Sequence, residues 1–199
     1  AAPESFTNTH LFMVEPGIVL RTAALLEPPH TVDDKLRGAA LYALDSFRHF
    51  RNRLGDVLTA VNASISHGIL RQLLHCTIQR LRELAKAESS PPSFDVFVDA
   101  LMTLIANLAT VASGTSMATG AGLVPQMLEL ACIEAPTNYL VQRTSTRAVG
   151  LLDSILYAYP STFQQFTASH GIDVLVRRVE SDMSLEQGPE PLPYGRVHV

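Results

Sequence analysis

The sequence predicts an all-α protein, an armadillo-like helical-repeat solenoid in which three-helix repeats wind into a right-handed superhelix. Three observations lead to this fold class. Apolar residues recur at steps of three and four over long stretches, which is the spacing of one face of an α-helix. Signals for β-strands are weak. A glycine that opens a helix returns at intervals of 51, 54 and 49 residues, and a fixed period of this size is typical of a solenoid.

Three long helices are expected, over Asp33–Phe50, Phe94–Ala112 and Leu140–Ala158. Each carries apolar residues at helical spacing, which predicts one buried stripe per helix. Ser93 follows two prolines, a break that helices do not cross easily, and it is the expected N-cap of the second long helix.

The recurring glycines are Gly17, Gly68, Gly122 and Gly171, and each precedes a run with helical spacing. Positions +1, +5 and +8 after each glycine lie on one face of a helix and are mostly apolar, so this face is expected to be buried. The expected core positions are Ile18, Ile69, Leu123 and Ile172 at +1, Thr22, Leu73, Met127 and Val176 at +5, and Leu25, Cys76, Leu130 and Val179 at +8.

Each repeat is expected to hold a long helix, a short helix and the glycine-led helix. The clearest repeat runs from 137 to 183, where Pro160 opens a short helix over Ser161–Ser169. Residues 1–30 are interpreted as the end of a truncated repeat, and residues 31–185 as about three armadillo-like repeats. Residues 186–199 are rich in proline and glycine and are expected to form a disordered linker. Neither end resembles the polar cap that a solenoid needs, so the chain is interpreted as a slice of a longer superhelix.

In armadillo stacks the glycine-led third helices line the concave face. Positions +4 and +7 point away from the predicted core, and they are expected to form a mixed polar groove that binds protein. These candidate binding residues are Arg21, Gln72, His75, Gln126, Glu129 and Arg178.

Composition favours a protein partner over nucleic acid or membrane. Charged residues make up only 17% of the chain, below the roughly 25% of an average soluble domain, so part of the surface is expected to be covered. The net charge of −4 argues against a basic nucleic-acid footprint. The sequence contains no uninterrupted apolar run of the roughly 18 residues that a membrane span needs, and its start lacks the features of a signal peptide.

No constellation of residues points to catalysis, a cofactor or a metal ion. Cys76 falls at a predicted core position and is expected to be a small buried hydrophobe. Cys132 has no base near it in sequence and is also expected to be structural. The seven histidines lack the i, i+4 spacing of a helical metal site, and His67 and His170 are expected to close the turn before a repeat glycine. Two cysteines without a disulfide pattern suggest a reducing compartment.

Taken in order, these helices and turns resemble the N-terminal armadillo region of the giant HECT-type ubiquitin ligases, the HUWE ligases of animals and the Tom ligases of fungi. The likeness covers about residues 33–183. It is carried by Asp33–Leu70 with Leu36, Ala39-Ala40 and His67-Gly68, by the run from Phe94 through Asn107-Leu108-Ala109, by the Gly120–Val124 turn, and by Gly171-Ile172 and Arg177–Glu180.

The resemblance implies a very large parent protein whose distant HECT domain passes ubiquitin from a thioester to substrate lysines. This chain would be a non-catalytic, substrate-presenting segment of its solenoid, in cytoplasm and nucleus. Its partners would be protein substrates, the remaining solenoid and, through the parent, the ubiquitin machinery. The alternative is a stand-alone armadillo-type adaptor for transport or assembly, although the polar groove lacks the Trp/Asn ladder of nuclear-import receptors. A free-standing enzyme has no residues to support it.

Overall fold

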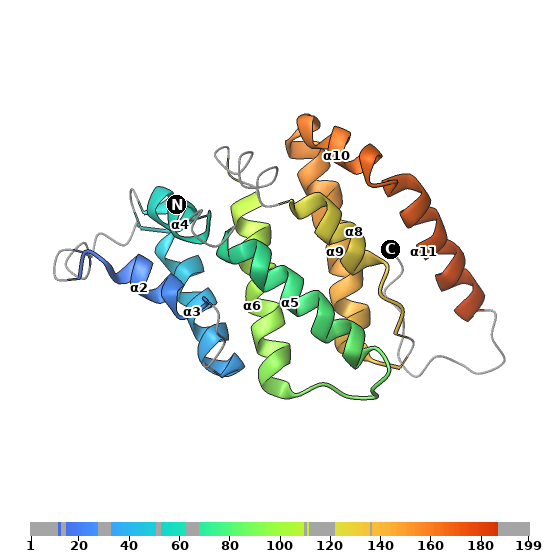
Figure 1. The fold of residues 1–199 in the computed structure, drawn as a ribbon, viewed down its shortest axis with the longest axis horizontal. Coiled ribbons are helices and arrows are strands. Elements are labelled where there is room, and N and C mark those ends of the chain that lie inside the picture. The colour runs from blue at the N-terminus through green and yellow to red at the C-terminus, as the bar shows by residue number, and fades with distance from the viewer. Residues whose placement is uncertain are drawn as a thin grey trace, which may run out of the picture. The chain divides into compact units, whose positions relative to one another are not determined.

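The structure is a computed structural model, and it describes residues 12, 15–27, 33–50, 53–62, 68–109, 111, 122–135 and 137–186. Within these ranges the regular elements are helices, and no strand is found, so the expected all-α class is confirmed (Figure 1). The chain divides into two compact units. The first comprises residues 1–73 and 92–117, and the second comprises residues 74–91 and 118–199.

In the first unit, α3 packs along α6, and this pair forms its main core (Figure 1). Gly38 faces α6, and a Cβ built there would lie in ordinary van der Waals contact, 3.4 Å from the Phe97 backbone. The Arg37 guanidinium lies 4.4 Å from the centre of the Phe97 ring. The helices of this unit are α2 (Ile18–Ala24), α3 (Asp34–Phe47), α4 (Leu54–Asn62), the first turn of α5 (Ile69–Leu84) and α6 (Pro92–Ala109).

In the second unit, α8 packs along α9. Asn138 is the N-cap of α9, where its Oδ1 accepts a hydrogen bond from the Val141 backbone N–H. Its Nδ2 donates to the backbone carbonyls of Leu84 and Ala87, at 3.1 and 3.0 Å, and so ties α9 to the end of α5. The helices of this unit are the rest of α5, α8 (Leu123–Ala131), α9 (Tyr139–Ala158), the 3-10 turn η3 (Pro160–Thr162), α10 (Phe163–Ala168) and α11 (Gly171–Glu186).

The three expected long helices are present as α3, α6 and α9, with ends that differ by up to three residues. Ser93 is not the N-cap of α6, because the helix already begins at Pro92. A proline fits the first turn of a helix, where its missing N–H costs no hydrogen bond. The predicted order of long, short and third helix is found in α3–α4–α5 and in α9–α10–α11. Winding of the repeats into a right-handed superhelix stays a prediction. The expected linker lies outside the described residues apart from Glu186.

Helix α6 is, among the described residues, the one helix that is long and apolar enough to cross a membrane by length and composition alone. Ten of its 18 residues are buried within the structure, and α3 covers it. It therefore has the features of the core helix of a helical unit.

The predicted buried face at +1, +5 and +8 is confirmed throughout α8 and at Ile69 and Leu73 of α5, whereas it is wrong for α2 and α11. In α5 the +8 residue Cys76 is exposed, and in α2 Leu25 is exposed. The face that α2, α5 and α8 bury in common lies at +2, +6 and +9. Its residues are Val19, Ala23 and Leu26 in α2, Leu70, Leu74 and Thr77 in α5, and Val124, Leu128 and Ala131 in α8.

In α11 the three predicted core residues, Ile172, Val176 and Val179, are all exposed. The turn before α11 also differs from the turns before α5 and α8. Gly68 and Gly122 precede their helices in the left-handed region, with φ of 84° and 61°, but before α11 this conformation belongs to His170, with φ of 53°. Gly171 is already the first residue of the helix, so counting from it shifts the register by one residue.

Candidate protein-binding surface

The six predicted binding residues are divided between the two units. Arg21 and Gln72 belong to the first unit, and the other four belong to the second. A continuous row of all six therefore stays a prediction, and the surroundings of each residue are considered within its own unit.

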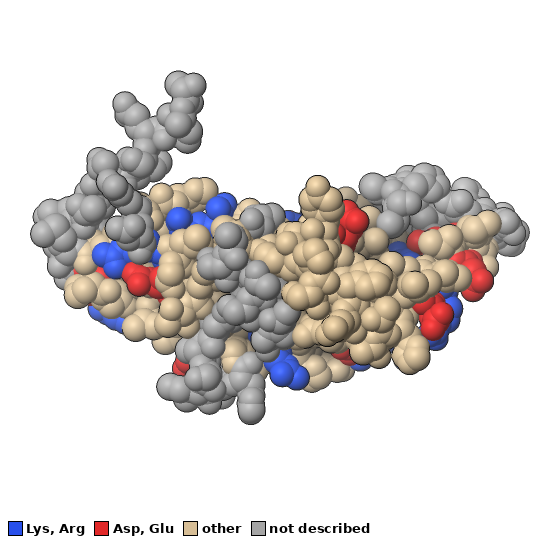
Figure 2. Space-filling model, turned by 90° about the horizontal axis from the view of Figure 1, so that it is seen from above, with Lys and Arg blue, Asp and Glu red and all other residues tan. Residues whose placement is uncertain are grey.

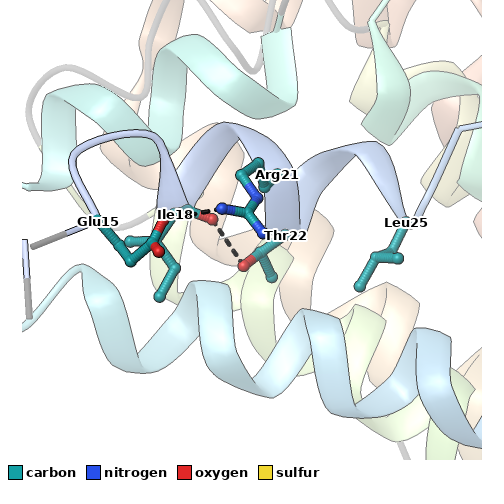
Figure 3. A pocket seen from close by; sticks show the side chains of 5 residues that line it. All are labelled: Glu15, Ile18, Arg21, Thr22 and Leu25. Atoms are coloured by element: carbon teal, nitrogen blue, oxygen red, sulfur yellow. Dashed lines mark hydrogen bonds and ion pairs between the residues drawn. The ribbon is translucent and has the colours of Figure 1, made fainter.

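Arg21 lies on an open groove along α2. Its Nη1 donates to Glu15 Oε2 at 2.8 Å, and the two side chains form an exposed ion pair. The groove has a volume of about 480 Å³ and is lined by Glu15, Ile18, Arg21, Thr22 and Leu25. Figure 3 shows these side chains along the helix, with Leu25 apart from the Glu15–Arg21 pair. The groove thus follows the +1, +5 and +8 face that was predicted to be core.

Gln126 is buried and Gln72 is half-buried, so neither offers much side-chain surface to a ligand. Most of α8 is enclosed, including both Leu123 and Val124 at its start. Pro125 is exposed and Glu129 is partly exposed. Because α8 is enclosed on most of its circumference, only a narrow strip of the helix is open to solvent. Gln126, at the +4 position, does not lie on that strip.

Arg178 points into the second unit. Its Nη1 donates to the Ala131 backbone carbonyl at 2.7 Å and also to the Ser145 hydroxyl. Its Nε donates to Asp182 Oδ2 at 2.9 Å. The last carbonyls of a helix have no partner within the helix, and a guanidinium supplies several donors for them. Arg178 therefore joins α11 to the end of α8 and to α9.

The remaining predicted residues, His75 and Glu129, mark a surface that is open and polar. Arg82 Nη2 forms an ion pair with Glu129 Oε1 at 2.8 Å, which brings the outer sides of α5 and α8 together. His75, Gln79 and Arg82 are exposed and follow steps of four and three along α5. We call His75, Gln79, Arg82 and Glu129 the α5–α8 polar strip.

Gln79 and Arg82 were not predicted, because the candidate binding positions after each glycine extended only to +7. These residues stand at +11 and +14 after Gly68, on the same helical face as His75. The glycine-led helix α5 is 16 residues long, whereas α8 has nine. Extending the same spacing over the full apolar pattern of α5 would have found them.

Both cysteines are exposed, which corrects the expectation that Cys76 is buried. Cys76 lies to one side of the Leu70, Leu74 and Thr77 face that α5 buries. Cys132 is exposed at the surface, but its neighbours partly desolvate the thiol, which raises its pKa, and the nearby Arg177 and Arg178 oppose this rise. Desolvation outweighs the two arginines and the pKa of Cys132 is raised, so Cys132 is a thiol at neutral pH and a weak nucleophile.

Among the residues that the structure describes, no three His, Cys, Asp or Glu side chains gather closely enough to hold a metal ion. His170 takes part in the turn before α11, where its Nδ1 lies 3.5 Å from Asp173 Oδ2. His67 lies outside the described residues.

The face drawn in Figure 2 is mostly uncharged, and its acidic and basic side chains form small scattered groups. No broad basic stripe of the kind that binds nucleic acid is visible on this face. The described residues thus form a helical protein with a mixed polar and apolar surface.

Comparison with known proteins shows which sequences this chain is similar to. Residues 1–79 match the family described as Domain of Unknown Function (DUF908). Over 192 residues the chain is 24% identical to the E3 ubiquitin-protein ligase ptr1 of Schizosaccharomyces pombe, covering 95% of this chain and 6% of that protein.

Two further relatives are similar over nearly the same span. The chain is 26% identical over 177 residues to the E3 ubiquitin-protein ligase TOM1 of Saccharomyces cerevisiae, covering 88% of this chain and 5% of that protein. It is 28% identical over 175 residues to the E3 ubiquitin-protein ligase UPL1 of Arabidopsis thaliana, covering 87% of this chain and 4% of that protein.

No solved structure matches the chain. The resemblance to a segment of the giant E3 ubiquitin-protein ligases, expected from the sequence, is confirmed over most of the chain. The chain spans only 4–6% of the length of these relatives.

Proposed function

We propose that this chain is a non-catalytic, substrate-presenting scaffold segment of a HECT-type E3 ubiquitin-protein ligase that works in cytoplasm and nucleus. Its partners are protein substrates and the other helical repeats of the same polypeptide. Ubiquitin transfer takes place on a distant domain, and this segment needs no cofactor of its own.

The observation that carries the proposal is the similarity to E3 ubiquitin-protein ligases of fungi and a plant over 87–95% of the chain. The chemistry of the segment agrees with a binding role. Cys132 has a raised pKa, which is the opposite of what a thioester-forming cysteine needs.

The α5–α8 polar strip is the part of the second unit that we propose to contact substrates. It offers an imidazole, an amide, a guanidinium and a carboxylate, which can all hydrogen-bond to an extended polypeptide. The Arg82–Glu129 pair is solvent-exposed, so it contributes only about 0.2–1 kcal/mol to stability and can open to engage a ligand. Groups of both signs suit a sequence-tolerant interaction.

The test is made in the full-length ligase. The triple variant His75→Ala, Gln79→Ala and Arg82→Ala removes three of the four strip side chains without touching the buried face of α5. Each lost hydrogen bond contributes about 0.5–1.5 kcal/mol, so we expect substrate capture and substrate ubiquitylation to fall by about tenfold or more. The ubiquitin thioester of the ligase should form at the unchanged rate.

The matched control is the triple variant Arg143→Ala, Asp153→Ala and Gln164→Ala, which removes three exposed polar side chains from other parts of the same unit. It should leave capture unchanged, and circular dichroism of both variants should equal that of the parent. If the triple variant in the α5–α8 polar strip captures a panel of substrates as well as the control variant does, the segment shapes the solenoid and does not bind substrates.

A further inference from the structure

Helix α11 carries a stripe of large apolar side chains that face water. Ile172, Val176, Val179 and Met183 are each between 50% and 60% exposed. They follow steps of four, three and four, so they form one continuous line along the helix. Four large apolar residues in a row on one helix face mark an interaction site more clearly than scattered ones do.

The stripe corresponds to a face that the equivalent helices bury. When each helix is counted from the left-handed residue before it, which is Gly68, Gly122 or His170, the stripe occupies positions +2, +6, +9 and +13. The residues at these positions in the other helices are Leu70, Leu74, Thr77 and Leu81 in α5, and Val124, Leu128 and Ala131 in α8, and all of them are buried.

The elements that pack on the equivalent helices suggest what covers this face. Helix α8 packs chiefly against α9, the long helix that follows it in sequence. In the first unit α2 packs against α3, the long helix that follows it, and to the same extent against α4. In both cases the third helix of one repeat is covered by the first helix of the next repeat.

The other side of α11 is already occupied. Helix α11 packs against α8 and α10. Arg178 holds it there through the Ala131 carbonyl and Ser145, and its side chain is only 11% exposed. On a helical wheel Arg178 lies more than a quarter turn from Val176 and Val179. The stripe therefore faces away from the contacts that fix α11 in the second unit.

We propose that the stripe formed by Ile172, Val176, Val179 and Met183 is the seat of the next helical repeat of a longer polypeptide. The occupant is the apolar face of a long amphipathic helix that lies beyond Val199 in the same polypeptide. The relatives, of which this chain spans 4–6%, have ample length to supply it. The proposal rests on that part of the proposed function in which the chain is a segment of a larger ligase, and it does not depend on substrate binding.

The test uses two single-cysteine substitutions in the full-length polypeptide. Val176→Cys places a thiol in the stripe, and Ser184→Cys places one at an exposed position of the same helix, about 80° around the helix axis from Val176 and outside the stripe. Maleimide labelling is followed peptide by peptide with mass spectrometry, and each rate is normalised to the rate in denaturant. We expect Val176→Cys to react at least about tenfold more slowly than Ser184→Cys, because a docked helix shields it. Equal rates would overturn the proposal.

A second measurement identifies the occupant. A photoreactive residue in place of Val179 should crosslink within the same polypeptide to a segment beyond Val199. A crosslink to residues 187–199, to a second copy or to another protein would overturn the proposal. The outcome is independent of the strip variant, whose readout is substrate ubiquitylation. If the α11 stripe is shielded but the α5–α8 polar strip variant captures substrates normally, only the substrate-presenting role is refuted. If the stripe is accessible but the polar strip variant loses substrate capture, only the docking proposal is refuted.

Discussion

Arg177 and Arg178 are neighbours on α11, yet their side chains meet different surroundings. Arg177 is exposed and donates to the Asp173 backbone carbonyl one turn earlier. Arg178 reaches the carbonyl end of α8 and the hydroxyl of Ser145. A pattern of helix positions could not separate these two arginines, because the distinction depends on which helix lies opposite.

Removing Arg178 should therefore destabilise the fold. Arg178→Ala leaves the Ala131 carbonyl with one donor fewer and Asp182 without its ion pair, and hydrogen bonds to charged groups contribute about 1.5–3 kcal/mol each. We expect a loss of about 2–3 kcal/mol in urea unfolding. Arg177→Ala should change stability by less than about 0.5 kcal/mol. Equal effects of the two substitutions would show that the Arg178 contacts are not made in solution.

The raised pKa of Cys132 predicts a pH dependence. Partial desolvation favours the neutral thiol, so the stabilisation it gives is fully present below the pKa of an unfolded thiol and is lost as the pH rises from that value through the higher pKa of the folded chain. We expect iodoacetamide to alkylate Cys132 in the folded chain with a pH midpoint above the one found in denaturant. A Cys132→Ser variant should lose this part of the alkaline stability change. An alkylation midpoint at or below that of the unfolded chain would contradict the assignment.

At the scale of helices, the two glycines of the last repeat have opposite roles. Gly150 lies in the middle of α9 with open space where a Cβ would stand, whereas a Cβ on Gly171 would lie 2.1 Å from the Phe166 ring. The small size of Gly171, and not an unusual backbone angle, lets α10 and α11 meet.

The pair gives a test with opposite signs. Gly150→Ala should stabilise the chain by about 0.5–1 kcal/mol, because alanine favours a helix over glycine. Gly171→Ala should destabilise it by about 1–3 kcal/mol, the usual cost of overpacking. Thermal unfolding measures both. Phe166→Leu should recover part of the loss in the Gly171→Ala background, and stabilisation by Gly171→Ala alone would show that the two helices do not touch as described.

Helix α6 offers a test of the core that the sequence predicted. Leu104 is fully buried between apolar neighbours of the first unit, so Leu104→Ala should cost about 2–5 kcal/mol. Val96 on the same helix is half exposed, and Val96→Ala should cost less than about 1 kcal/mol. Denaturant unfolding of the two variants decides the matter. A loss below about 0.5 kcal/mol for Leu104→Ala would place this face in solvent.

The sequence was most informative for helices whose buried face can be predicted from the spacing of apolar residues alone. Helices α3, α6 and α9 follow from their apolar periodicity, because each buries one broad face. The start of α11 at Gly171 was predicted, but its register was offset by one residue, because a histidine, and not a glycine, adopts the left-handed conformation before it. Gln126 was expected to be open and is buried, because α8 is enclosed on most sides. The burial of Gln126 depends on segments that are distant in sequence, so it cannot be predicted from the pattern of nearby residues.

At the scale of the whole chain, the two units are interleaved in sequence. The first unit needs residues 92–117, which follow the part of α5 that belongs to the second unit. Helix α5 itself crosses the division between Leu73 and Leu74. The repeats predicted from the sequence therefore do not coincide with the two compact units. Truncation of the chain between two predicted repeats would remove helices from both units.

This interleaving has a consequence for synthesis on the ribosome, where the chain emerges from its N-terminus. When residue 117 has left the exit tunnel, the first unit has all of its segments and can close. The apolar side chains of Leu74, Ile78 and Leu81, which are buried in the finished fold, then still lack α8 and α9, the later helices of their own unit. During this interval the nascent chain exposes the apolar face of the part of α5 that belongs to the second unit, and we expect Hsp70-type chaperones to bind there. Chains stalled so that residue 117 has just left the tunnel should recruit more chaperone than chains stalled so that residue 186 has left it, and equal recruitment would show that α5 is shielded before its unit is complete.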